Sequence, residues 1–370
     1  MNKPSVAIIY DKFLAQGGGE RVCEMSTEAL PEARIYALNA RPRAFWEAKL
    51  GRPIISPMFG GLFASRFLVT ALYPVAALLM VSLRVKADVV IAYSSTCGKF
   101  VRLDCERSIL YSNYPNRGLY EPDKMIRSRL LRWILAPVLA AMRIPERRAI
   151  RKYGRKISIS DTSRRAMLDF SGIDTEVLMP PFNEKGLTGA MNASESRSDS
   201  DEPYYVLISR LEPEKELTYA IDAFRQSGRR LRVIGTGSQL TQFRSMATAN
   251  IEFLGYVDDA ELARSLSGAR ALIFPSEIEY SLVPLEAAFL GTPIIAYDGA
   301  AMREILVDSQ SGRCDANAVF YGEKSAAGLA RAIRTFETVA WDKEAMKRGA
   351  AAFGRLAFID KVRELVYGPE

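Results

Sequence analysis

The segment that decides the fold is ALIFPSEIEYSLVPLEAAFLGTPIIAY, residues 271–297. Its first four residues, Ala271 to Phe274, are apolar and predict a buried strand. After a loop, a helix is expected near Val283 to Leu290, and the turn Gly291-Thr292-Pro293 leads into a second apolar strand, Ile294 to Tyr297. Strand, loop, helix and strand in this order predict a parallel sheet with binding loops at the carboxyl ends of its strands.

The same alternation runs through both halves of the chain. The further strands that it predicts are Ser5–Tyr10, Asp88–Tyr93, Ser108–Tyr111, Lys156–Ser160, Tyr204–Ser209, Leu231–Ile234 and Asn250–Leu254. A glycine turn, Gly17 to Gly19, and a helix from Glu20 to Leu30 follow the first of them. A chain of 370 residues suits two domains of about 180 residues each. We therefore expect an α/β protein with two doubly wound, Rossmann-like domains.

The boundary between the two domains is expected after Pro180-Pro181. Residues 184–203 are poor in large apolar side chains and rich in Ser, Asp and Glu, which is typical of a linker. The predicted organisation is a first domain at 1–183, a linker at 184–203, a second domain at 204–345 and a segment at 346–370 that is mostly helical in pattern.

Composition excludes several classes of site. The chain has no histidine, so neither an imidazole base nor a histidine-ligated metal is available. The four cysteines are scattered without a CxxC pair, which favours reduced thiols in a cytosolic protein. The first residues, MNKPSVAIIYDK, lack the apolar stretch of a signal peptide.

Two segments of the first half could contact a membrane. Phe67 to Leu83 is uncharged and apolar, but its 17 residues include Pro74 and are at the lower limit for a span, so a buried or interfacial helix is expected. Residues 124–156 contain eleven basic residues and one acid, Glu146, in a chain whose net charge is +7. The basic charge is therefore concentrated in one patch.

Apolar and aromatic residues interleave with the arginines of this patch. A basic helix of this kind can lie in an anionic membrane surface, and a core helix with solvated arginines fits the pattern equally well. Nucleic acid is disfavoured because no recognition motif accompanies the patch. The residues assigned to the membrane hypothesis are Arg127, Arg129, Arg132, Trp133 and Arg143.

A phosphate site is suggested in the second half. Arg210 and Lys215 follow a predicted strand, and two cations there can clamp a phosphate pair, although a surface loop of mixed charge has the same composition. Ser281, Leu282 and Val283 are expected to present backbone N–H groups at a helix N-terminus, which attracts a diphosphate. Glu286, in the first turn, suits either a hydroxyl pair or simple helix capping.

The motifs SRLEPEK (209–215), VIGTG (233–237), NIEFLGYV (250–257) and FPSEIEYSLVPLEAAFLGTPIIAY (274–297) together resemble the retaining glycosyltransferase family 4, in particular its mannosyltransferase-like branch. Weaker matches in the first half are YDKFLAQGGGER, AYSSTCGKFVR and YSNYPNRGLYEP. The resemblance implies the GT-B fold, in which two Rossmann-like domains face each other across a cleft and the C-terminal helix returns to the first domain.

The resemblance also implies roles for individual residues. Arg210 and Lys215 would bind the donor diphosphate, and Glu286 would hold the donor ribose. The full donor-binding set that it implies is Gly18, Gly19, Gly237, Tyr256, Val257, Ser281, Leu282, Val283 and Glu286, with the tyrosine and valine flanking the base. No metal or other cofactor is implied, because the two cations and the helix N-terminus take the metal's place.

Two departures from the family pattern affect the sugar. The family's paired acids would stand at 278 and 286, but this chain has Ile278. A shift of one residue lets Glu279 serve, so Arg210, Lys215 and Glu279 are assigned to catalysis. Where the family often has a histidine at the sugar, YSNYPNR offers Asn113, with Arg117 assigned beside it on the acceptor side.

Taken together, these features predict a retaining, metal-independent hexosyltransferase. Its expected donor is GDP-mannose, and its expected acceptor is a lipid-linked saccharide at the cytoplasmic face of the inner membrane, in cell-surface polysaccharide or lipopolysaccharide assembly. Ile278, Asn113 and the absence of histidine motivate a second hypothesis, a catalytically silent partner subunit at the membrane.

Overall fold

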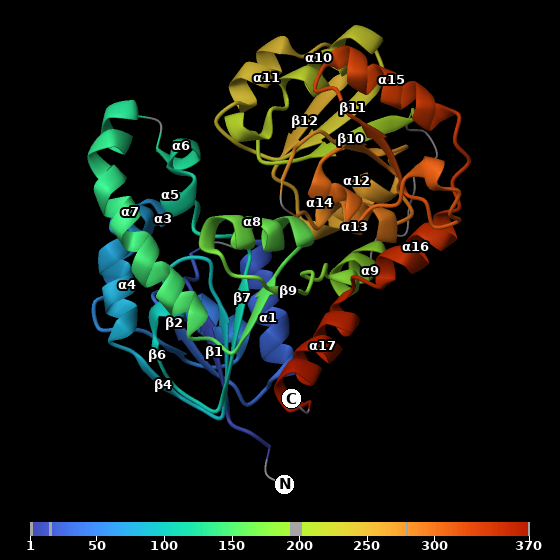
Figure 1. Cartoon of the computed structure of the whole chain (residues 1–370). Helices are drawn as coiled ribbons and strands as arrows, with labels where there is room; N and C mark the ends of the chain where they lie inside the picture. The colour runs from blue at the N-terminus through green and yellow to red at the C-terminus, as the bar shows by residue number, and fades with distance from the viewer. Residues whose placement is uncertain (1–2, 15–16, 127, 193–201, 279, 369–370) are drawn as a thin grey trace. The chain divides into compact units, whose positions relative to one another are not determined.

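The structure is a computed structural model that describes residues 3–14, 17–126, 128–192, 202–278 and 280–368 (Figure 1). It divides the chain into two compact units. Unit 1 comprises residues 1–180 and 356–370, and unit 2 comprises residues 181–355. Each unit is built on one parallel sheet with helices between its strands, which confirms the predicted α/β class with two Rossmann-like domains.

The sheet of unit 1 has the strand order β3-β2-β1-β5-β7-β8-β9, and all neighbouring strands are parallel. Its central strands are apolar and buried, as expected for a parallel sheet covered on both faces. The strands are β1 (Val6–Tyr10), β2 (Arg34–Ala37), β3 (Ile54–Ile55), β5 (Val89–Tyr93), β7 (Arg107–Ser112), β8 (Arg155–Ser158) and β9 (Glu176–Val177). A separate small sheet pairs β4 (Arg84–Lys86) with β6 (Arg102–Asp104).

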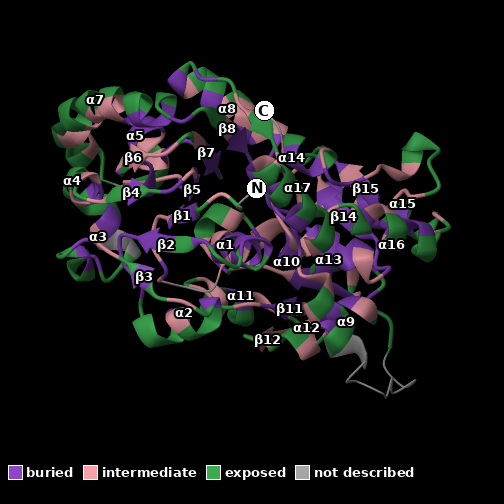
Figure 2. Cartoon of the chain, turned by 90° about the horizontal axis from the view of Figure 1, so that it is seen from below, coloured by how far each residue is buried: buried purple, intermediate pink, exposed green. Residues whose placement is uncertain are grey.

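The helices of unit 1 include one long element, α7. The helices are α1 (Gly18–Ala29), α2 (Arg43–Leu50), α3 (Arg66–Ala71), α4 (Tyr73–Val81), α5 (Arg117–Tyr120), α6 (Pro122–Met125), α7 (Arg129–Arg151), α8 (Asp161–Ser171) and α17 (Arg355–Tyr367), with 3₁₀ turns at Gly60–Leu62 and Gly98–Phe100. The side chain of Ser128 caps α7 by accepting a hydrogen bond from the Leu131 amide at 3.3 Å. Most of α7 is exposed, and its buried residues, Glu146, Ala149 and Ile150, lie towards its C-terminal end (Figure 2).

The apolar segment 67–83 forms two short helices, α3 and α4, which meet at Leu72. Pro74 lies in the first turn of α4, where its missing N–H costs no hydrogen bond. Among the residues described, no helix is both long enough and apolar enough to cross a bilayer.

The sheet of unit 2 has the order β12-β11-β10-β13-β14-β15, again with parallel neighbours. The strands are β10 (Tyr204–Ile208), β11 (Arg230–Ile234), β12 (Ile251–Gly255), β13 (Leu272–Phe274), β14 (Ile294–Tyr297) and β15 (Ala318–Tyr321). The helices are α9 (Glu184–Asn192), α10 (Thr218–Ser227), α11 (Leu240–Met246), α12 (Asp259–Ser267), α13 (Val283–Phe289), α14 (Ala300–Arg303), α15 (Ala326–Glu337) and α16 (Lys343–Ala351), with 3₁₀ turns at Pro213–Lys215 and Ser309–Ser311.

Both sheets contain a point where the strand order reverses. In unit 1 the chain proceeds from β1 to one side and returns to the other side at β5. In unit 2 the same reversal falls between β10 and β13. Loops that leave the carboxyl ends of such strand pairs diverge and form a crevice, where α/β proteins bind their ligands. These two edges are therefore the places to examine for a site.

The predicted linker at 184–203 is wrong over its first half. Residues 184–192 form helix α9, which packs against α12 and α13 within unit 2 and buries Leu187. The composition was misleading because a short helix with few large apolar residues can still pack through one buried leucine. Residues 193–201 of the predicted linker lie outside the described residues.

The predicted segment 346–370 also begins at the wrong place. Helix α16 packs against α13 in unit 2, and the chain turns at Gly354, where an added Cβ would collide with the Glu184 carboxylate. Only the following helix, α17, belongs to unit 1. The helical pattern runs through both helices, so it does not reveal the break between them.

Candidate functional site

The loop after β10 carries both predicted cations of unit 2. Arg210 lies two residues beyond the strand, and its side chain is exposed and pairs with Glu214 at 3.5 Å. Lys215 ends the 3₁₀ turn that Pro213 begins, and Glu216 follows with a left-handed backbone (φ 51°). This is the only non-glycine residue with positive φ among the described residues, and strain of this kind often accompanies function.

Two glycines let the loop after β11 pack directly against the loop after β10. An added Cβ at Gly235 would collide with the carbonyl oxygen of Ser209, and one at Gly237 would collide with that of Leu211. Gly235 also has φ +135°, which other residues rarely adopt. The VIGTG motif is thus explained by a close backbone approach at the sheet edge.

The loop after β12 carries the residues predicted to flank the base. The amide of Gly235 donates to the carbonyl of Gly255 at 2.7 Å, which ties this loop to its neighbour. Tyr256 follows directly, and its side chain is 86% exposed. Val257 is partly buried beside it.

The loop after β13 leads into α13. Leu282 is the N-cap of this helix, Val283 its first residue, and the Glu286 amide donates to the Leu282 carbonyl at 2.9 Å. The Glu286 side chain is buried, at 5% exposure. Glu279, assigned to catalysis, lies outside the described residues.

The loops after β10 and β13 are joined to each other. The buried Ser276 hydroxyl donates to the Lys215 carbonyl at 3.2 Å, and the Tyr219 hydroxyl donates to the Pro275 carbonyl at 2.8 Å. The structure therefore brings Arg210, Lys215 and the start of α13 to the reversal point of one sheet.

Sequence reasoning missed Lys324, which follows β15. Its ammonium donates to Glu216 at 2.7 Å and to Glu277 at 3.0 Å, so it ties the same two loops together. Burial disfavours its charged form, but the two carboxylates outweigh this and raise the pKa of Lys324 above its usual range. Its partners lie 108 and 47 residues away, and β15 was not predicted, so no local signal pointed to it.

The carboxyl edge of unit 1 is organised by Asp11, a second residue that was missed. Its carboxylate accepts hydrogen bonds from the Ser94 hydroxyl (2.6 Å) and from the amides of Ser95, Thr96 and Gly98 (2.9, 2.9 and 2.7 Å). The loop after β5 is therefore folded around a carboxylate at the end of β1. Four donors on one carboxylate fix this loop firmly.

Asn113 and Gly19 are brought together at this edge. The Asn113 amide donates to the Ser95 hydroxyl at 3.0 Å, and the Ser163 hydroxyl donates to the Asn113 carbonyl at 2.8 Å. A Cβ on Gly19 would lie 2.7 Å from the Tyr10 hydroxyl and 3.5 Å from the Asn113 amide nitrogen. The glycine at position 19 thus allows α1 to start against Asn113. Gly18, the first residue of α1, has open space around it.

Arg117 lies at the start of α5, in the same motif. Its guanidinium is over the Tyr114 ring, 4.7 Å from the centroid, and 3.8 Å from Glu121. Asn116 caps α5 by accepting a hydrogen bond from the Gly118 amide at 3.1 Å. The segment 113–117 therefore carries both residues assigned to the acceptor side.

The exposed part of α7 is apolar as well as basic. Its exposed large apolar side chains are Leu130, Leu131, Trp133, Ile134, Val138 and Ile144. Arg129 is exposed and Arg132 partly so, while Arg127 lies outside the described residues. Six exposed large apolar side chains on one helix are unusual on a protein without a partner.

Arg143, which the sequence assigned to the membrane patch, is half-buried and contacts a neighbouring helix. Its guanidinium donates two hydrogen bonds to the Leu119 carbonyl, at 3.0 and 2.8 Å, and lies over the Tyr120 ring. The residue attaches α7 to α5. Composition alone does not distinguish an arginine that faces solvent from one that caps a neighbouring carbonyl.

Known proteins resemble this chain in part of its sequence and in its whole fold. The family described as glycosyl transferases group 1 matches residues 191–353. A glycogen synthase of Mycobacterium tuberculosis is 32% identical over 156 residues, and a phosphatidyl-myo-inositol mannosyltransferase of Mycobacterium leprae is 29% identical over 169 residues. These matches cover 39% and 42% of this chain, and only 36% and 44% of the relatives' own lengths.

Solved structures extend the likeness to the complete fold. HepE of Anabaena in complex with UDP has a TM-score of 0.65 at 16% identity, covering 99% of this chain and 100% of that one. Sucrose-phosphate synthase of Thermosynechococcus elongatus has a TM-score of 0.68 at 15% identity and covers 98% of each chain. At such low identity the likeness shows the fold alone, and that fold is the predicted GT-B class.

Proposed function

We propose that this protein transfers a sugar from a nucleotide-sugar diphosphate, because residues 191–353 match the family described as glycosyl transferases group 1. One observation carries the proposal. Two cations, Arg210 and Lys215, share the reversal point of a parallel sheet with the start of α13, and Ser276 links the two loops. Cations and backbone N–H groups gathered at such a point suit a diphosphate.

In this proposal Arg210 and Lys215 bind the donor diphosphate and stabilise the charge that develops on it as the bond to the sugar breaks. No metal is required, because the two cations and the amides of residues 281–283 supply the positive field. Glu286 accepts hydrogen bonds from the ribose, Gly237 allows the phosphates to approach the backbone, and Tyr256 and Val257 flank the base. The acceptor hydroxyl attacks from the face that the diphosphate leaves, so configuration is retained.

The identities of the donor and the acceptor are proposed from other observations. The likeness to a phosphatidyl-myo-inositol mannosyltransferase supports a mannosyl donor, with GDP-mannose as the specific proposal. HepE was solved with UDP and with UDP-glucose, which makes a UDP-sugar the principal competitor. The exposed apolar surface of α7 supports a lipid-linked saccharide acceptor and work at the cytoplasmic face of a membrane, in surface polysaccharide assembly.

A catalytically silent partner subunit is the second candidate. It is favoured by Ile278, which cannot hydrogen-bond a sugar hydroxyl, and by the neighbouring Glu277, whose carboxylate is engaged by Lys324. Such a protein would keep the nucleotide site and the α7 surface without turnover.

A binding screen followed by a transfer assay separates the two candidates. GDP, UDP and ADP are titrated into the purified protein, and the radiolabelled sugar of each matching donor is then offered with bacterial membrane extract. Label in the lipid fraction supports the enzyme, whereas nucleotide binding without transfer from any donor supports the silent partner.

The first variant to test is Lys215→Ala. We expect it to weaken nucleotide affinity by about 10- to 100-fold, because one charge-assisted hydrogen bond to phosphate is lost. The control is Lys347→Ala, at an exposed lysine of the same unit that pairs with Glu344. Unchanged affinity in Lys215→Ala would refute the diphosphate assignment.

A further inference from the structure

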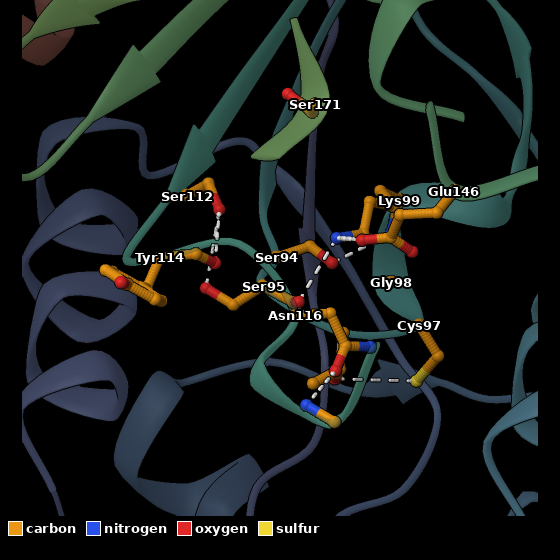
Figure 3. Close-up of polar contacts among 12 residues, drawn as sticks. Ser94, Ser95, Cys97, Gly98, Lys99, Ser112, Tyr114, Asn116, Glu146 and Ser171 are labelled. Atoms are coloured by element: carbon orange, nitrogen blue, oxygen red, sulfur yellow. Dashed lines mark hydrogen bonds and ion pairs between the residues drawn. The ribbon is translucent and has the colours of Figure 1, made fainter. Parts of the chain in front are cut away.

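An ion pair between Lys99 and Glu146 is completely enclosed within unit 1. The ammonium lies 2.5 Å from the Glu146 carboxylate, and the two side chains are 1% and 0% exposed. Figure 3 shows the two groups facing each other, one from the turn that follows β5 and the other from α7. No other ion pair given for the described part of the chain is buried on both sides.

Stability alone does not explain this pair. Removing two charges from water costs about as much free energy as their attraction returns, so an apolar pair of similar volume usually serves a core equally well. Removing only one partner is different, because the remaining charge is left buried without compensation. The reason for the pair must therefore be sought in what it positions.

Lys99 is connected to segment 113–117 through hydrogen bonds to the loop after β5. Its ammonium also donates to the Ser95 carbonyl at 3.1 Å, and its amide donates to the Ser94 hydroxyl at 2.9 Å. The Ser95 hydroxyl in turn accepts the hydrogen bond of the Asn113 amide. The ion pair thus fixes the loop on which the backbone of Asn113 rests.

Glu146 is connected to the same segment through Tyr73 and Asn116. Its other carboxylate oxygen accepts a hydrogen bond from the Tyr73 hydroxyl, which the Asn116 side chain also contacts. Asn116 caps α5, the helix that begins at Arg117. One carboxylate on α7 is therefore connected to both ends of segment 113–117.

We propose that Lys99 and Glu146 are a positioning pair that sets segment 113–117, the acceptor side of the proposed active site, in register with α7. The inference rests on the proposed function for its meaning in catalysis. The pair connects the helix that carries the exposed apolar side chains with the loop on which Asn113 rests. Neither residue touches substrate.

The test is the double variant Lys99→Met/Glu146→Met, which replaces the pair by apolar side chains of similar length. We expect a cooperative thermal transition close to that of the wild type and unchanged nucleotide affinity, because Arg210, Lys215 and Glu286, to which the proposal assigns the diphosphate and ribose, lie in unit 2. Hydrogen–deuterium exchange of the amides at 94–98 and 113–117 should rise about tenfold, while β1 and β5 keep their protection. The single variant Lys99→Met serves as comparison and is expected to unfold at lower temperature.

A matched control is Arg155→Met/Glu176→Met, which removes an exposed ion pair of the same unit, 2.6 Å long. This control should leave the amide exchange at 94–98 and 113–117 unchanged. With membrane extract as acceptor, the double variant should need a higher extract concentration for half-maximal transfer, with an unaltered KM for the donor.

Two exchange results would overturn the inference: unchanged exchange at 94–98 and 113–117, or a uniform rise throughout unit 1, which would show a purely structural role. The exchange measurement needs no turnover. If the wild type transfers no sugar, the enzymatic proposal fails while the exchange data still decide whether the pair positions the segment.

Discussion

Gly235 shows how one residue can determine how closely the loops after β10 and β11 pack against each other. Its φ of +135° and the nearby Ser209 carbonyl leave no room for a side chain. We expect Gly235→Ala to lower the free energy of unfolding by about 1–3 kcal/mol from backbone strain, and to weaken nucleotide binding because the two loops are forced apart. Urea unfolding and nucleotide titration measure the two effects. Gly322→Ala is the control, since a Cβ there meets nothing within 4 Å, and equal behaviour of both variants would refute the argument.

Lys152 should make stability depend on pH. Burial lowers its pKa to about 8, although its ammonium donates to the Val101 carbonyl, whereas an unfolded lysine has a pKa near 10.4. Between these values the unfolded chain binds more protons, so this stabilising contribution is present above about pH 10.4 and is lost as pH falls through 8. From pH 7 to pH 10 the wild type should gain about 1–2 kcal/mol relative to Lys152→Met.

Urea unfolding under reducing conditions at the two pH values measures this difference. Lys156→Met, at a lysine that donates to the Gly154 carbonyl, is the comparison. Parallel pH profiles for the wild type and Lys152→Met would contradict the prediction.

The candidate residues that sequence reasoning found are those with a local signature. Arg210, Lys215 and Glu286 stand in motifs next to strands that their composition reveals. Asp11, Lys99 and Lys324 went unnoticed, because each acts through partners 47 to 108 residues away. The contact of Arg143 with the Leu119 carbonyl is likewise invisible in a sequence that shows only a basic patch.

At the scale of elements, the exposed surface of α7 makes a testable contribution. Trp133 is 78% exposed, and its burial in a membrane interface would stabilise binding by about 1.5–3 kcal/mol. Trp133→Ser should therefore reduce flotation with phosphatidylglycerol-containing vesicles by at least tenfold in affinity, and added salt should weaken binding of the wild type.

Leu356→Ser is the matched control for this experiment, because Leu356 is also exposed but lies on α17. If both variants float like the wild type, α7 is not a membrane contact. If only the salt dependence is missing, its apolar face binds without help from Arg129 and Arg132.

Most of the apolar strands were predicted, although β15, which is as long and as apolar as β14, was missed. β1, β5, β10 and β14 were predicted directly from the sequence because continuous apolar runs identify buried parallel strands. β3 and β9 were missed because each has only two residues, and both residues of β9 are exposed. Strands this short are stabilised by pairing with a neighbouring strand. The local sequence pattern does not show this pairing.

At the scale of the whole molecule, the two units depend unequally on the last helix. Removing residues 356–370 deletes four buried side chains of α17, Phe358, Ile359, Val362 and Val366. It also leaves the Arg107 guanidinium without the carbonyls of Val366 and Gly368 that it contacts at 2.7 and 3.1 Å. At about 1.5–3 kcal/mol for each apolar side chain, this loss rivals the stability of a typical domain.

We therefore expect the truncated chain to lose protease resistance in unit 1, while unit 2 remains intact and binds nucleotide. Limited proteolysis with mass spectrometry, together with nucleotide titration, checks both parts. Equal resistance of the two units after truncation would show that α17 contributes little to unit 1.

The position of α17 also has a consequence for synthesis. Unit 1 begins the chain but is completed by its last helix, so it cannot finish folding when its first 180 residues leave the ribosome. It must wait until unit 2 and residues 356–370 have been made, which takes on the order of 10–40 s at ordinary elongation rates. During that interval the surface destined for α17 is uncovered, and the nascent protein is then most open to chaperones and to aggregation.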